Sequence, residues 1–340
     1  MAGRASIKDV AAAAGVSIKT VSRVVNGVST VDAGMRERVE QAVRDLHYVP
    51  NSTARSLKSG AGNTIGVIVD SIDDVFFSSL ISAIEESALS AGLGVVIGST
   101  GHDPDRERDQ VLRMTAQNVR GIILAPVSDR LDALEPYRPV LPVVAVDRKL
   151  ADRDSVTIDD HGAARSAVAE LLAAGHRRIA LLGWDPDFST SQDRRRGYED
   201  ALREKGIEVD PDLVPLVPYR DPRPTQALRS VLDLTAPPTA LFLGNARLAA
   251  GAIAATHTLG RTDLALISFG DFLLADSVDP SVSCIDQDPY EIGELALRRL
   301  LELLEDPQSP ARQHIVPTAF IPRTSHTLTP RTLTPEGRTR

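Results

Sequence analysis

The chain has very little cysteine and no long apolar run, and both absences narrow its location. Cys284 is the single cysteine among 340 residues, so no internal disulfide can form. No stretch of roughly 18 apolar residues is available to cross a membrane. The N-terminus also lacks the charged segment followed by an apolar segment that directs export. These absences predict a protein of a reducing compartment, the cytoplasm.

Motifs of the common enzyme classes are missing as well. Gly60-Ala61-Gly62 precedes a strand-like segment and lacks the remaining glycine spacing of a dinucleotide site, and the chain has no P-loop and no serine elbow. The seven histidines are scattered without metal-ligand spacing. His176 lies in a Gly-His-Arg-Arg turn and is expected to be a structural hydrogen-bond donor. We therefore expect no catalysis, no metal and no cofactor.

Charge is present but unevenly distributed. The net charge is −8, yet residues 1–60 hold nine Lys and Arg against five Asp and Glu, whereas the remaining residues hold 29 basic and 41 acidic side chains. A small basic module is therefore attached to an acidic body. Such a module favours a nucleic-acid partner, which the net charge alone would argue against.

The basic module carries the signals of three short helices. Helix caps and breaks follow one another along the chain: Ser6 with Asp9, Gly15-Val16, Ser17, Asn26-Gly27, Asp32, and Tyr48-Val49-Pro50. The side chains expected to face inward are Ile7, Val10, Ala11 and Ala14, then Val21, Val24 and Val25, then Met35, Val39, Ala42, Val43 and Leu46. Three short helices with a tight glycine turn predict a helix-turn-helix unit.

The acidic body alternates strand-like apolar runs with amphipathic helices. The expected strands are Thr64–Val69, Leu93–Gly98, Gly121–Ala125, Val143–Val146, Arg178–Gly183, Ala240–Leu243 and Leu264–Phe269. The expected helices include Ser78–Ala91, Glu107–Asn118, Ala163–Ala174, Arg194–Lys205 and Glu291–Leu304. Apolar runs interleaved with helices imply parallel sheets covered on both faces, and some ten strands exceed one average domain. We expect two doubly wound parallel sheets.

Several segments resemble the LacI/GalR (lactose-repressor) family of bacterial transcription regulators. In the basic module the resemblance is carried by Ser6-Ile7-Lys8-Asp9-Val10-Ala11, Gly15-Val16-Ser17, residues 20–27 (TVSRVVNG), Tyr48-Val49-Pro50-Asn51 and Ala54-Arg55-Ser56-Leu57. In the body it is carried by Phe76-Phe77, Val146-Asp147-Arg148, residues 175–179 (GHRRI), Arg194 before Gly197-Tyr198, and Gln287-Asp288-Pro289. The resemblance implies a helix-turn-helix domain over residues 1–50, a hinge helix and linker over 51–62, and a two-lobed periplasmic-binding-protein-like domain over 63–329. The segment over 330–340 is rich in Thr, Pro and Arg and is expected to be a disordered tail.

The second helix is expected to read DNA, because a helix that opens with short polar residues can enter the major groove by its N-terminus. Lys19 and Arg23 can donate to guanine, and Ile18 can contact a thymine methyl. The residues expected to hold phosphates are Ser17, Thr20, Ser22, Asn26 and Thr30. Further DNA contacts are expected from Ser6, Ile7, Tyr48, Asn51, Ala54, Arg55, Leu57 and Lys58.

Leu57 is an apolar residue in the polar hinge, and the resemblance implies that two such leucines, one from each subunit, wedge into a central minor-groove step. The alternative is that Leu57 packs against the body. A homodimer on a pseudo-palindromic operator is expected, because two-fold protein symmetry matches two half-sites. No leucine heptads follow Pro330, so the family's tetramerisation helix is not expected.

Two lobes with a cleft between them offer a place for a small polar effector at the carboxyl ends of the strands. Polar and aromatic residues that follow strand-like runs are the candidate contacts: Asp74, Phe76, Phe77, Asp147, Arg148, Asp160, Arg194, Tyr219, Asn245, Asp271 and Gln287. Aromatic faces can stack on a sugar ring while the carboxylate, amide and guanidinium groups bond its hydroxyls.

The chain departs from the family pattern around this cleft. Asp74-Val75 replaces the common Asn-Pro, Asn245-Ala246 replaces Asn-Asp, and Ser268-Phe269-Gly270-Asp271 replaces the usual Gly-Phe/Tyr-Asp-Asp. A plain hexose is therefore less favoured, and a pentose, a polyol, a sugar acid and a disaccharide all remain open. Trp184 could line the cleft or cover a crossover.

Effector binding is expected to change operator affinity through the hinge, by a coupling of roughly 1 to 3 kcal/mol. The sequence does not fix the sign of this coupling or decide between repressor and activator. A solute-binding protein would share the two-lobed architecture, but it would need export and would not need the first 58 residues.

Overall fold

The computed structural model describes residues 5–25, 28, 30–48, 62–137, 141–183, 188–217 and 224–330. The chain divides into two compact units, one ending at Gly62 and the other beginning at Asn63. Residues 51–61 of the expected hinge and residues 331–340 of the expected tail lie outside the described residues. Within the described part, no helix is both long enough and apolar enough to cross a bilayer.

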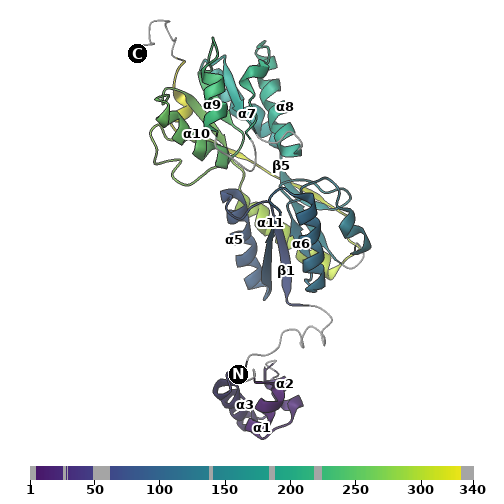
Figure 1. The fold of residues 1–340 in the computed structure, drawn as a ribbon. Helices are drawn as coiled ribbons and strands as arrows, with labels where there is room; N and C mark the ends of the chain where they lie inside the picture. The colour runs from purple at the N-terminus through teal and green to yellow at the C-terminus, as the bar shows by residue number, and fades with distance from the viewer. Residues whose placement is uncertain are drawn as a thin grey trace. The chain divides into compact units, whose positions relative to one another are not determined.

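The first unit contains the three expected helices, α1 (Ile7–Ala14), α2 (Ile18–Val25) and α3 (Ala33–Asp45) (Figure 1). The Ser6 hydroxyl accepts from the Asp9 amide and the Asp9 carboxylate accepts from the Ser6 amide, which together form the predicted capping box. Gly15 ends α1 in the left-handed region at φ 63°. Glycine suits this position because it has no Cβ to clash.

Small aliphatic side chains from all three helices form the core of this unit, among them Val10, Val21 and Val39. One inward assignment is wrong, because Met35 is 41% exposed. Met35 lies in the first turn of α3, next to its cap at Asp32, where the side chain does not reach the other helices' core.

Two α/β lobes make up the second unit (Figure 1). The first lobe has a six-stranded sheet in the order β10-β5-β4-β3-β1-β2, and all its pairings are parallel. Its strands are β1 (Thr64–Val69), β2 (Gly94–Ser99), β3 (Ile122–Leu124), β4 (Val143–Val146), β5 (Asp154–Ile158) and β10 (Gln313–Val316). Its helices are α5 (Val75–Ser90), α6 (Pro104–Ala116) and α11 (Pro289–Glu305), with the 3-10 helix η1 (Asp132–Tyr137).

The second lobe has a five-stranded sheet in the order β11-β9-β8-β7-β6. Its strands are β6 (Ile179–Leu182), β7 (Ala240–Leu243), β8 (Ala265–Phe269), β9 (Ser283–Asp286) and β11 (Ala319–Ile321). Its helices are α7 (Asp160–Ala173), α8 (Ser189–Glu204), α9 (Thr225–Leu232) and α10 (Ala246–Thr258), with η2 (Pro211–Leu213) and η3 (Ser325–Thr327). The expected parallel arrangement is confirmed for both sheets, and the one antiparallel pairing is that of β11 with β9 at the edge of the second sheet.

The chain passes between the lobes after β5, after β9 and after β10, as the sheet orders require. All three passages leave the carboxyl end of a strand. The carboxyl ends of parallel strands share one edge of a sheet, so the residues that follow the strands are gathered where the lobes meet.

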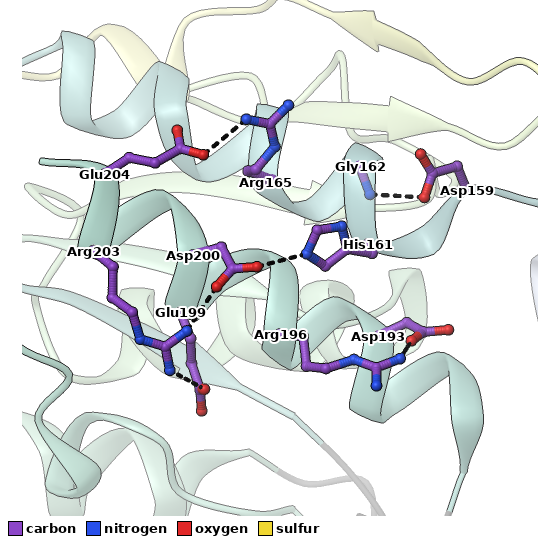
Figure 2. Close-up of polar contacts among 10 residues, drawn as sticks. All are labelled: Asp159, His161, Gly162, Arg165, Asp193, Arg196, Glu199, Asp200, Arg203 and Glu204. Atoms are coloured by element: carbon purple, nitrogen blue, oxygen red, sulfur yellow. Dashed lines mark hydrogen bonds and ion pairs between the residues drawn. The ribbon is translucent and has the colours of Figure 1, made fainter.

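Helices α7 and α8 pack closely against each other in the second lobe. A Cβ on Gly197 would lie 2.3 Å from the carbonyl oxygen of His161, so only glycine permits this approach. On the outer side, His161 pairs with Asp200 at 2.9 Å and Arg165 with Glu204 at 2.9 Å (Figure 2). Exposed ion pairs of this kind contribute little to stability. The helix pair is therefore held mainly by its close-packed interior.

Candidate DNA-binding and effector sites

Helix α2 presents an exposed face opposite its buried valines. Val21 and Val24 are buried, whereas Ile18 is 46% exposed and Lys19 and Arg23 are exposed. The Ser17 hydroxyl accepts a hydrogen bond from the Thr20 amide at 3.1 Å and therefore caps the helix. The structure thus brings the three expected base-reading side chains to one solvent-facing surface at the start of a capped helix.

The other expected DNA contacts have mixed environments. The Arg23 guanidinium donates to the Thr30 hydroxyl at 2.6 Å, which links the two residues on the same surface. Ser6 is engaged with Asp9 in the capping box, and Ile7 and Tyr48 are partly buried against the core of this unit. The expected contacts Asn26, Asn51, Ala54, Arg55, Leu57 and Lys58 lie outside the described residues.

A cleft lies between the two lobes of the second unit. Thirteen described residues line it: Asp70, Asp74, Phe76, Phe77, His102, Asp147, Arg148, Phe188, Thr190, Arg194, Asn245, Ala246 and Gln287. Eight of the eleven residues expected from the sequence are among them. The prediction rested on positions after strands, and the carboxyl ends of parallel strands lie together at one edge of a sheet. Tyr219 and Trp184 lie outside the described residues.

A buried ionic cluster forms the side of the cleft that belongs to the first lobe. Arg148 follows β4 and its guanidinium pairs with Asp70, which directly follows β1. It also pairs with Asp147 at 3.2 Å, and His102 Nδ1 lies 3.1 Å from Asp70. Burial alone would raise the pKa of Asp70, but Arg148 and His102 hold it below its usual range. Burial raises the pKa of Asp147 despite the same arginine.

Arg194 is the central group of the opposite wall. Its Nε donates to Asp160 at 2.7 Å and its Nη1 donates to the carbonyl oxygen of Gly244 at 2.8 Å. Its guanidinium also lies 3.8 Å from the ring centroid of Phe269. Burial raises the pKa of Asp160 to about 6, although Arg194 acts against this shift. Asp160 therefore holds Arg194 in place and does not itself line the cleft.

Amide and carboxyl groups supply further polar atoms. Asn245 caps α10, since its Oδ1 accepts from the Leu248 amide at 2.8 Å. Its Nδ2 is buried and has no hydrogen-bond partner among the described residues, so it is a donor available to a ligand. Asp74 caps α5 by accepting from the Phe76 amide at 2.9 Å, and burial raises its pKa.

Asp271 is not brought into this cleft. It lines a neighbouring hollow with Phe76 and Gln287. Its two carboxylate oxygens accept from Arg323 at 2.9 and 2.6 Å. Burial would raise the pKa of Asp271, yet the bonds from Arg323 keep it below its usual range. The partner arginine lies 52 residues further along the chain, so the sequence pattern could not reveal it.

The sequence interpretation missed five lining residues, Asp70, His102, Phe188, Thr190 and Ala246. Asp70 and His102 follow strands, so the rule that found the other residues applies to them as well. Phe188 and Thr190 follow no strand directly, and no sequence signal marked them. His176 is structural, as expected, because its two ring nitrogens face the Thr239 hydroxyl at 2.8 Å and the Leu328 carbonyl at 2.7 Å.

Comparison with family models gives two matches. Residues 6–51 match the model described as bacterial regulatory proteins, lacI family. Residues 168–326 match the model described as a periplasmic binding protein-like domain. The first match covers the helix-turn-helix unit, and the second covers most of the second lobe together with α11 and β10 of the first.

Curated relatives and a solved structure extend the likeness over the whole chain. The HTH-type transcriptional repressor CytR of Escherichia coli (strain K12) is 34% identical over 307 residues, 88% of this chain and 90% of the relative. Catabolite control protein A of Priestia megaterium is 31% identical over 306 residues, 88% of this chain and 92% of the relative. The lac repressor dimer bound to operator and the anti-inducer ONPF has a TM-score of 0.81 at 26% identity, covering 96% of this chain and all of that one. This chain therefore belongs to the lacI family of bacterial regulatory proteins and is a DNA-binding transcriptional regulator, not an enzyme.

Proposed function

We propose that the protein is a repressor that binds a pseudo-palindromic operator as a homodimer and responds to a sugar or sugar derivative bound between its lobes. The observation that carries the DNA-binding part is the exposed face of α2, where Ile18, Lys19 and Arg23 project from a helix anchored by Val21 and Val24. Lys19 and Arg23 would donate to guanine and Ile18 would contact a thymine methyl. The remaining predicted DNA contacts and the four-part division at residues 50, 62 and 329 belong to the same proposal.

The proposed dimer is supported by apolar side chains on the first lobe. Strand β2 is the edge of its sheet, and Ile97 on this strand is 46% exposed. Leu89 on α5 and Leu112 on α6 are 70% and 40% exposed, and both helices contact β2. An unpaired edge strand with apolar neighbours is a surface that a second subunit can cover.

The proposed effector site is supported by the variety of groups in the cleft. Arg148 and Arg194 supply cations, Asp74 and Asp147 supply carboxyl groups, and Asn245 supplies a free amide donor. Such a set matches a ligand with several hydroxyl groups, each of which can donate and accept. Effector binding would change operator affinity by a coupling of roughly 1 to 3 kcal/mol, about 5- to 150-fold. The proposed location is the cytoplasm, in association with the nucleoid.

Selection of bound sequences from a random duplex pool tests this function. The pool is incubated with the full chain, and bound duplexes are amplified and sequenced, in parallel with the Arg23→Ala variant. We expect a palindromic site to be enriched by the wild type and one symmetric pair of positions to lose its preference in the variant. Enrichment of no sequence by the wild type would overturn the proposal.

A further inference from the structure

The cleft between the lobes has almost no free space. Its volume is about 30 Å³. Pockets that bind small molecules commonly measure about 300 to 1,000 Å³. A sugar therefore cannot enter the cleft unless the groups that fill it move apart.

Phe188 is the side chain that fills the cleft from the second lobe. It is the residue immediately before α8, it makes no capping hydrogen bond, and it is only 6% exposed. Its ring stacks on His102 of the first lobe, with centroids 3.9 Å apart and planes 23° from parallel. The Arg148 guanidinium lies 5.0 Å from the same ring. Ring stacking and cation–π attraction both favour such an arrangement.

The surface that receives Phe188 is fixed by contacts within the first lobe. Asp70 pairs with both His102 and Arg148, and the side chains of all three are at most 6% exposed. These residues follow three different strands or their connections, β1, β2 and β4, so the sheet sets their relative positions. A second contact between the lobes joins Arg247 to Asp73 at 3.6 Å, but Asp73 is 67% exposed and this pair contributes little.

We propose that Phe188 holds the two lobes together in the effector-free protein by stacking on His102, and that the effector binds by parting these two rings and placing a flat face between them. This inference rests on the proposed function, since it assumes an effector in this cleft. Phe188 and His102 would then select ligands that present a planar ring or the C–H face of a sugar ring. Highly branched or spherical polyols would be disfavoured.

The distance between the lobes tests the proposal without any knowledge of the effector. Spin labels are attached to cysteines introduced at Asp105 on α6 and Lys205 at the end of α8, both exposed sites on different lobes. Cys284 is fully buried, so reagent has no access to the native thiol in the folded protein. The labelled full chain is compared with its Phe188→Ala and Phe320→Ala variants. Phe320 is the matched control, because its ring contacts His326 within the second lobe at a centroid distance of 5.2 Å.

We expect a narrow distance distribution in the wild type and in Phe320→Ala, and a broader one with a different mean in Phe188→Ala. Identical distributions in all three proteins would overturn the proposal. If Phe188→Ala does not fold, the His102 ring resonances in the wild type and in Phe188→Leu supply the test. We expect the His102 ring protons to have upfield chemical shifts in the wild type and ordinary chemical shifts in Phe188→Leu. Ordinary chemical shifts in both proteins would contradict the stacking. Operator selection is run on the same wild-type protein, so a failure of the DNA-binding function is seen separately.

Discussion

Replacing Arg194 with methionine should destabilise the protein by an amount that depends on pH. The substitution keeps an apolar side chain of similar length over Phe269 but removes the bonds to Asp160 and Gly244. At pH 8 the Asp160 carboxylate would be left buried without its cation. Breaking a buried ion pair in this way costs about 3 to 5 kcal/mol of unfolding free energy.

Lowering the pH should reduce this cost. The pKa of Asp160 is already raised to about 6 by burial, and the loss of Arg194 would raise it further. At pH 5 the carboxyl group is therefore protonated in the folded variant, and the remaining cost is about 1 to 3 kcal/mol for the hydrogen bond lost at Gly244. The folded state binds this proton more tightly than the unfolded state, so the stability of the variant falls as the pH rises.

Urea denaturation followed by circular dichroism at pH 5 and pH 8 measures the effect. The control is Arg165→Met on α7, which removes an exposed pair with Glu204 and should cost less than about 1 kcal/mol at either pH. A destabilisation by Arg194→Met that is equal at both pH values would refute the role assigned to Asp160.

Three further predictions concern other parts of the chain. Arg23→Ala should weaken operator binding by about 1 to 3 kcal/mol and relax one base preference in a binding-site titration, whereas a uniform loss over all sequences would exclude base reading. Burial raises the pKa of Glu107 from 4.5 to about 7, so this group contributes a fall in wild-type stability as the pH rises between these values. Glu107→Gln should reduce that slope in urea denaturation and gain about 2 to 3 kcal/mol at pH 8, whereas an unchanged slope would contradict the shift. Gly197→Ala should lower the unfolding free energy by about 1 to 3 kcal/mol, because its Cβ would meet the His161 carbonyl oxygen. The control Gly34→Ala in α3 should stabilise the protein slightly, and a Gly197→Ala variant as stable as the wild type would contradict the close packing.

Local signals made the first unit predictable from the sequence. Ser6, Gly15 and Asp32 act through bonds to residues within a few positions, and the structure confirms all three. Met35 was assigned wrongly because helical periodicity does not show where the neighbouring helices end. In the second unit the apolar strands were recognised, but β5, β9, β10 and β11 were missed. All four are short, and all except β11 contain polar residues.

The cleft was predictable to the extent that its residues follow strands. Asp147, Arg148 and Asn245 were identified in this way, because topology places the carboxyl ends of parallel strands together. The partners of these groups could not be predicted. Pairing of Asp160 with Arg194 and stacking of Phe188 on His102 join residues 34 and 86 positions apart, and each depends on how the helices and lobes pack.

The central claim is that a ligand in the cleft controls operator affinity, and one measurement tests it most directly. The affinity for the selected operator is determined for the wild type and for Arg194→Met, each in the presence of a panel of pentoses, hexoses, polyols, sugar acids and disaccharides. We predict that one compound changes the wild-type affinity by at least about 5-fold and leaves the affinity of Arg194→Met unchanged. A compound that binds the wild-type cleft, as shown by loss of the Phe188–His102 contact, but leaves operator affinity unaltered would contradict the account.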